Sequence, residues 1–131
     1  MPIPCLTNRN TNLDQMAIKH RSKIILEVGL DENRIAEEIK WTATDAGIEN
    51  EPAEAFLLSV WNDHTKETLR LDLWTKEMKV YEMQFFVWQT ISSLAETYRK
   101  ATGDDRMADT ILDLADYMEE KLELKKGPKD R

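Results

Sequence analysis

The stretch FLLSVWNDHTKETLRLDLWT, residues 56–75, decides the fold because it carries the pattern of a β-hairpin. Apolar residues recur at every second position in both halves, which is the period of half-buried strands. If Asp63 to Lys66 form a four-residue loop, Val60 lies opposite Leu69, and a slip of one residue would turn every side chain to the wrong face. The pattern therefore predicts one apolar face on the hairpin, made of Phe56, Leu58, Val60, Leu69, Leu71 and Leu73.

The opposite face of the same hairpin is mixed in character. It carries charged side chains beside two indoles, which a purely solvated face would not need: Ser59, Trp61, Arg70, Asp72 and Trp74. Exposed tryptophan and arginine are typical anchors of protein interfaces, and an apolar patch with a charged rim often marks one. We therefore treat this face as a candidate partner surface.

Two further strands are expected before the hairpin. Residues 23–30 (KIILEVGL) and 39–43 alternate apolar and other side chains, and the polar segment 31–37 between them suits a turn or one helical turn. Because Pro52 cannot donate a backbone hydrogen bond, the third strand is expected to begin after it, at 53–62, with a brief helix at 51–55 as the alternative start. The fourth strand is 67–75.

From about Tyr81 the apolar period changes from two to 3.6, which predicts an amphipathic helix to Ala101. Gly103 suits the left-handed residue that ends a helix, and Asp104 opens a second helix that ends near Lys125. Strands followed by a helix pair predict an α+β fold. We expect a four-stranded antiparallel sheet with the antiparallel C-terminal helices packed on one face, so that Leu71→Asp would unfold the domain.

At 131 residues the chain has the size of one domain. Residues 1–18 are rich in Asn, Thr and Pro without periodicity, which predicts a disordered N-terminal extension, and Met16 offers an alternative start. The single α+β domain is expected at 19–125, and the charged residues 126–131, with Gly127 and Pro128, form a frayed C-terminal tail.

The charge balance argues against two classes of partner. Lys and Arg number 18 against 25 Asp and Glu, a formal net charge of −7, and no long basic run interrupts the sequence. Nucleic acid and an anionic membrane are therefore not expected as partners, and the lack of a spanning run argues against direct membrane insertion. The single cysteine, Cys5, cannot form an internal disulfide, and no signal-peptide or spanning pattern is seen, so a cytoplasmic location is expected.

A search for catalytic chemistry finds no motif. His20 and His64 are the only histidines, and neither has a ligand at metal spacing. The four glycines are isolated, so there is no phosphate-binding loop, and no serine has the context of a nucleophile. Acidic pairs such as Glu119 with Glu120 are explained by helix chemistry. We expect no catalytic residue, no metal and no cofactor, and hence no enzyme.

The four tryptophans divide into two groups. Trp41 shares a face with Ile39 and Ala43, so the core is its expected place. Trp61 and Trp74 are out of phase with the apolar strand face, and a partner protein, a second copy of the chain, or cover by residues 45–52 or by the N-terminal tail would each account for them. Trp88 lies off the apolar stripe of its helix and joins the candidate surface.

Four segments in order give a resemblance. WTATDAG at 41–47, LLSVWND at 57–63, LRLDLWTKEM at 69–78 and ATGDDRMA at 101–108 resemble the gliding motility protein GldC family, over residues 18–124. The resemblance implies a small cytoplasmic protein that assists the bacterial gliding machinery through protein–protein contacts, without an enzymatic reaction.

Two readings follow for function. The first is a non-enzymatic accessory protein that uses Trp61, Arg70, Asp72, Trp74 and Trp88 to contact motility components or another copy of itself. The alternative is a small-ligand-binding or enzymatic domain with a pocket between sheet and helices near Arg70 and Asp72. Buried charges in a cavity would favour the alternative, and a flat exposed patch would favour the first.

Overall fold

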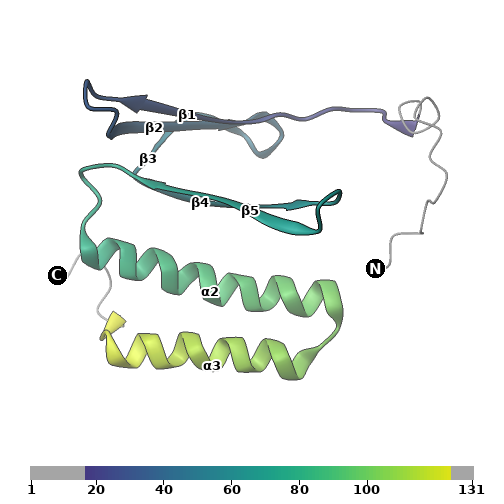
Figure 1. Cartoon of the computed structure of the whole chain (residues 1–131). Helices are drawn as coiled ribbons and strands as arrows, with labels where there is room; N and C mark the ends of the chain where they lie inside the picture. The colour runs from purple at the N-terminus through teal and green to yellow at the C-terminus, as the bar shows by residue number, and fades with distance from the viewer. Residues whose placement is uncertain (1–16, 125–131) are drawn as a thin grey trace. The chain divides into compact units, whose positions relative to one another are not determined.

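The computed structural model describes residues 17–124, and this part of the chain forms two compact units. The strands lie in a unit that ends at Met78, and the helices lie in a unit that begins at Lys79 (Figure 1). The α+β class predicted from the sequence is confirmed. The extension predicted at 1–18 lies outside the described residues except for positions 17 and 18, and the tail predicted at 126–131 lies entirely outside them.

The first three strands form an antiparallel sheet in the order β1–β2–β3: β1 at Ile24–Leu30, β2 at Ala36–Ala43 and β3 at Ile48–Ala53. Strand β2 lies in the centre, and the alternation of apolar residues places Val28, Ile39 and Ala53 across the three strands on one face. Ile39 is 1% exposed. Trp41 is half-buried on this face between positions 39 and 43, as expected.

The predicted single four-stranded sheet is wrong, because the strands form one three-stranded and one two-stranded sheet. The third strand, expected to begin after Pro52 and to occupy residues 53–62, instead runs from Ile48 to Ala53 as β3. Pro52 lies within it opposite Lys40, in a position that an edge strand tolerates, because within residues 17–124 no further strand pairs with the outer side of β3. The chain then bends at Glu54 and continues as the first strand of the second sheet (Figure 1).

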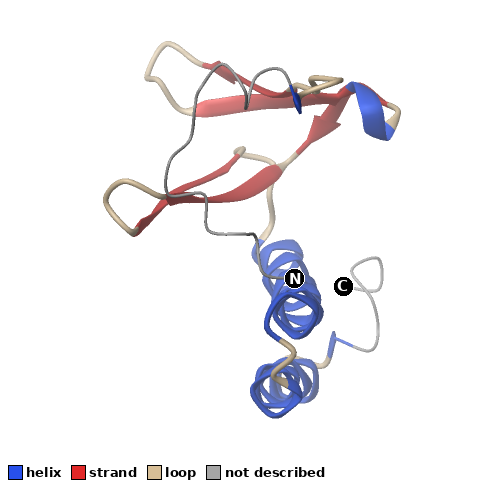
Figure 2. Ribbon diagram, turned by 90° about the vertical axis from the view of Figure 1, so that its right-hand side faces the viewer, coloured by secondary structure: helices blue, strands red, loops and turns tan. Residues whose placement is uncertain are grey.

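The second sheet is the predicted hairpin, with β4 at Ala55–Asn62 and β5 at Glu67–Trp74 (Figure 2). Its register is confirmed, since Val60 pairs with Leu69 and Leu58 with Leu71. Residues 63–66 form the turn, and the Asn62 side-chain oxygen accepts hydrogen bonds from the backbone N–H groups of His64 and Thr65. Asparagine is favoured at the start of such turns for this reason.

Hydrogen bonds and ion pairs connect the residues that follow β5 to the rest of the strand unit. Thr75 is buried, its backbone N–H donates to the Glu54 carbonyl at 2.8 Å, and its hydroxyl donates to the Glu54 carboxylate. Lys76 Nζ lies 2.5 Å from Asp31 Oδ2 in the β1–β2 turn and 3.3 Å from Glu37 Oε1. These contacts raise the pKa of Lys76, and the Lys76 hydrogen bond lowers the pKa of Asp31.

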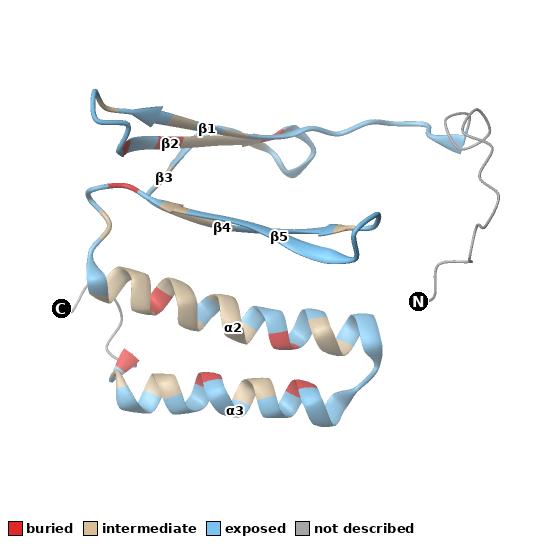
Figure 3. Cartoon of the chain, viewed as in Figure 1, coloured by how far each residue is buried: buried red, intermediate tan, exposed pale blue. Residues whose placement is uncertain are grey.

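The helix unit is an antiparallel pair, α2 at Val80–Thr102 and α3 at Asp105–Lys121. Small side chains let the helices approach, and Ala95, Ala108 and Ala115 are buried along α2 and α3, as is Phe85 (Figure 3). Gly103, with φ +73°, ends α2 in the left-handed conformation as predicted. The Asp104 side chain accepts a hydrogen bond from the Met107 N–H and so caps α3.

Candidate interaction surface

The mixed face of the hairpin is exposed, and we call it the tryptophan face: Ser59, Trp61, Arg70, Asp72 and Trp74. The register pairs Ser59 with Arg70, and the period of two places all five residues on one side of the hairpin. Trp61 is 60% exposed and Trp74 is 56% exposed. The sequence therefore predicted correctly which residues share this side.

The charges of this face form a fixed arrangement that the sequence did not reveal. Arg70 donates two hydrogen bonds to the Asp72 carboxylate, from Nη2 to Oδ1 at 2.6 Å and from Nε to Oδ2 at 3.3 Å. Its Nη1 donates to Ser59 Oγ at 2.5 Å. A bidentate arginine–carboxylate pair adds geometric specificity, so the guanidinium plane is held between the two tryptophan positions instead of moving freely in solvent.

This ion pair lies on an open surface. The side chains of Arg70 and Asp72 are 50% and 36% exposed. A charge pair of this exposure contributes little to stability, because solvent screens it. The ordered guanidinium and carboxylate beside two indoles present donors, acceptors and apolar area together, a combination that is typical of protein interfaces.

The opposite, apolar face of the hairpin is exposed as well. Phe56 and Leu73 are half-buried, but the remaining four side chains are exposed: Leu58, Val60, Leu69 and Leu71. The burial predicted for this face is thus not seen at the four positions nearest the turn. The hairpin consequently has large apolar side chains open on both sides.

Trp88, the fifth predicted surface residue, lies on α2 in the helix unit and not on the hairpin. It is half-buried, and its ring makes an edge-to-face contact with Phe85 at a centroid distance of 6.2 Å. Such aromatic pairs stabilise packing. Trp88 is therefore part of the packing of the helix unit, and Tyr117 on α3 is the most exposed aromatic residue there.

One histidine has a partner that the sequence did not suggest. His20 Nε2 lies 3.0 Å from Asp45 Oδ2, although the two residues are 25 positions apart. Hydrogen bonds from Ser22 and then from His20 lower the pKa of Asp45. The carboxylate stands between the serine and the imidazole, whereas activating a serine requires the imidazole to contact the hydroxyl. The trio thus lacks the order that nucleophilic catalysis requires.

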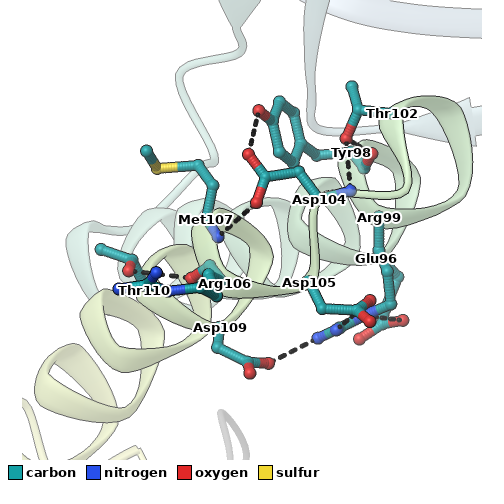
Figure 4. Close-up of polar contacts among 10 residues, drawn as sticks. All are labelled: Glu96, Tyr98, Arg99, Thr102, Asp104, Asp105, Arg106, Met107, Asp109 and Thr110. Atoms are coloured by element: carbon teal, nitrogen blue, oxygen red, sulfur yellow. Dashed lines mark hydrogen bonds and ion pairs between the residues drawn. The ribbon is translucent and has the colours of Figure 1, made fainter.

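Acidic groups cluster where α2 meets α3 (Figure 4). Arg99 donates to Asp109 at 2.7 Å and to Asp105 at 2.9 Å, and Glu96 lies 3.5 Å away. These carboxylates raise the pKa of the Arg99 guanidinium above its ordinary value. These ion pairs join the end of α2 to the start of α3, so the charges of Arg99, Asp105 and Asp109 already have partners within the helix unit.

Within residues 17–124, no three His, Cys, Asp or Glu residues come together as a metal site. A hollow of about 230 Å³ lies on the three-stranded sheet, lined by Glu27, Val28, Gly29, Glu38 and Lys40. Two of its charged side chains, Lys40 and Glu38, form an ion pair of 2.9 Å. None of the helices described is both long enough and apolar enough to span a bilayer.

Fold and site together define a small α+β protein with an exposed aromatic hairpin face. The chain belongs to the GldC-like family: the family model described as gliding motility-associated protein GldC-like matches residues 36–124, which is more than half of the chain. This confirms the resemblance read from the sequence. Neither the curated proteins nor the solved structures contain a match to the chain.

Proposed function

We propose that this protein is a non-enzymatic accessory component of bacterial gliding motility that acts in the cytoplasm by binding other proteins through its tryptophan face. Membership of the GldC-like family associates the chain with gliding motility. The observation that carries the binding role is the exposure of Trp61 and Trp74 on either side of an ordered ion pair.

Exposed indoles on a charged surface are typical anchors for a partner protein. An indole that leaves water on binding contributes a large apolar area at a low cost in side-chain entropy, since only two torsions are fixed. Tryptophan and arginine dominate the residues whose loss weakens protein complexes, by about 2 kcal/mol or more each when they lie at the centre of an interface. Both residue types are present here within one hairpin.

The ion pair gives this surface its selectivity. Arg70 is held by Asp72 and Ser59 before any partner arrives, so little conformational entropy is lost when the partner binds. A partner must offer acceptors for the remaining guanidinium N–H groups and an apolar surface for the indoles. The net charge of −7 disfavours a nucleic acid or anionic membrane in that role.

The ligand-binding alternative has less support. A small-molecule site needs a concave pocket with convergent polar groups. Arg70 and Asp72 are exposed and hydrogen-bond to one another and to Ser59, and the hollow on the three-stranded sheet is lined by other residues. The geometry of these residues therefore favours protein binding over ligand binding.

A crosslinking pull-down from cells of the source organism tests this function. The wild type is compared with Trp61→Ala and Trp74→Ala, and with Tyr117→Ala as a control that removes an aromatic ring of similar exposure, 58%, from the helix unit. A loss of about 2 kcal/mol weakens a complex about 30-fold. We expect the two tryptophan variants to lose specific partners that the Tyr117 variant retains.

Two readouts make this test decisive. Circular dichroism confirms that each variant is folded, and complementation of a deletion strain measures cell spreading. Recovery of the same proteins with all four chains would refute binding through the tryptophan face. If pull-down changes but spreading does not, the face binds proteins and the motility role is wrong.

A further inference from the structure

The outer edge of β5 is unpaired in the described part of the chain. Within residues 17–124, β5 forms a ladder with β4 alone. The strand's other side therefore presents a row of backbone N–H and C=O groups with no strand partner in this part of the chain. A two-stranded hairpin is marginally stable by itself in water, and further strands on its edge are one way to stabilise it.

The edge strands β1 and β3 carry features that discourage pairing, whereas neither strand of the β4–β5 hairpin does. A register shift interrupts β1 between Gly29 and Leu30, and Pro52 removes a donor from β3. Irregularities and proline are the devices by which proteins protect edge strands. Strand β5 has eight residues in unbroken register with β4, and its sequence ETLRLDLW contains no proline, glycine or lysine.

The sequence of β5 is complementary to itself when it is reversed. On the two sides of Leu71 stand Arg70 and Asp72, and beyond them Leu69 and Leu73. An antiparallel strand centred on the same leucine therefore places arginine opposite aspartate twice and leucine opposite leucine at positions 69, 71 and 73, with Thr68 opposite Trp74 at either end. Opposite charges in cross-strand positions stabilise a pair of strands, whereas like charges destabilise it.

We propose that β5 pairs in antiparallel register with β5 of a second copy of this chain, about a twofold axis at Leu71. Arg70 of each copy then faces Asp72 of the other on the tryptophan face, and Leu69 faces Leu73 of the second copy on the apolar face. The two hairpins become one four-stranded sheet in the order β4–β5–β5–β4. Such an interface is isologous, as closed dimers require.

The exposure of the side chains agrees with this register. Leu69, Leu71 and Trp74 are exposed along β5, and Leu58, Val60 and Trp61 along β4. Pairing brings the exposed leucines of two copies side by side, which removes apolar area from water. Arg70 and Asp72 already form an ion pair within one strand, so both charges lie on the side of the hairpin on which this register brings the charges of the two copies together.

This self-pairing goes beyond the proposed function and does not depend on it. It would double the tryptophan face, because Trp61 and Trp74 of both copies would lie on the same side of one sheet. The dimer can therefore fail while partner binding survives, and partner binding can fail while the dimer survives.

Charge reversal provides the first test, by light scattering on the full chain over a range of concentrations. Arg70→Asp places Asp against Asp72 of the second copy at both symmetric positions, and Asp72→Arg places Arg against Arg70. We expect each variant to dimerise about 10- to 100-fold more weakly than the wild type. The double variant with both residues exchanged restores two opposite-charge pairs and should recover the dimer.

Mixing the two single variants separates this interface from any effect within one strand. One chain then carries two aspartates and the other two arginines, so only the mixed dimer has opposite charges face to face. We expect the mixture to regain the wild-type mass, while each variant alone stays weaker. A monomeric wild type, or a dimer that tolerates each single reversal, overturns the proposal.

A cysteine at the axis tests the register directly. In a Cys5→Ser background, Leu71→Cys should form a disulfide-linked dimer under mild oxidation, because the two copies of this residue lie opposite one another. Leu69→Cys should not crosslink with itself but should crosslink with Leu73→Cys when the two are mixed. Equal crosslinking of the Leu69 and Leu71 variants with themselves would contradict this register.

Discussion

Ile39 is the residue whose truncation should most damage the strand unit. It lies on the central strand β2, with Val28 on one side and Ala53 on the other, and it is 1% exposed. Ile39→Ala removes buried methyl and methylene groups and leaves a cavity. Substitutions of this kind destabilise a protein by about 2–5 kcal/mol.

The matched control is Ile24→Ala on β1. Ile24 belongs to the same sheet and the same face, opposite Ala43, but it is 74% exposed. Full burial of such a side chain is worth about 1.5–3 kcal/mol, so the quarter that is buried here predicts a loss of about 0.4–0.8 kcal/mol. The two variants make the same chemical change at positions that differ only in burial and surroundings.

Thermal and urea unfolding followed by circular dichroism give the comparison. One kcal/mol shifts the Tm of a unit of about 60–100 residues by about 4–8 °C, so Ile39→Ala should lower the Tm of the strand unit by about 8 °C or more. Ile24→Ala should lower it by a few degrees at most. Equal losses for the two variants would show that Ile39 is not in the core of the strand unit.

Three further outcomes are expected. Gly103→Ala should reduce the free energy of unfolding by about 1 kcal/mol and lower the Tm, because φ is +73° at this position. Gly29→Ala should leave the Tm unchanged, since the new Cβ would lie at an ordinary 3.5 Å from the nearest side-chain atom. Asp104→Ala removes the cap of α3 and should cost about 0.5–2 kcal/mol in urea unfolding, and full stability would exclude the cap. The pKa of Asp31 is lowered in the folded state by Lys76, so its stabilising effect is present above the unfolded pKa and disappears as the pH falls through the folded one. Asp31→Asn should therefore reduce the fall in the urea unfolding midpoint as the pH drops below about 4. The same fall in the variant and in the wild type would refute this.

The hairpin shows how far periodicity alone can lead. The period of two and a loop of four residues gave the register of Val60 with Leu69, because any slip would mix the two faces. The same pattern identified which side carries Trp61 and Trp74. It could not reveal that Arg70 would hold both Asp72 and Ser59, since those bonds depend on side-chain conformations and not on spacing.

Strand β3 was missed for a different reason. Its sequence IENEPA has no alternation and contains Pro52, so its local preference does not favour a strand. It is a strand because β2 offers it a ladder, with Thr42 Oγ1 also accepting a hydrogen bond from the Asn50 N–H near the turn. Tertiary pairing of this kind overrides propensity, and the error in the predicted sheet follows from it.

Burial was the second property that the hairpin sequence did not determine. A period of two says that two faces differ, but it does not say what covers either of them. Leu58 and Leu71 face one another on the apolar side and are nevertheless exposed. The exposed edge of β5 and the exposed indoles are therefore where binding should be sought, and each has its own test.

Site-specific photocrosslinking in living cells tests the partner surface most directly. A benzophenone amino acid replaces Trp61 in one strain and Tyr117 in another, at positions of nearly equal exposure in the hairpin and the helix unit. We expect irradiation to give discrete covalent adducts with other proteins from position 61 and no matching adducts from position 117. Adducts that are the same from both positions, or none from position 61, would contradict a partner surface on the tryptophan face.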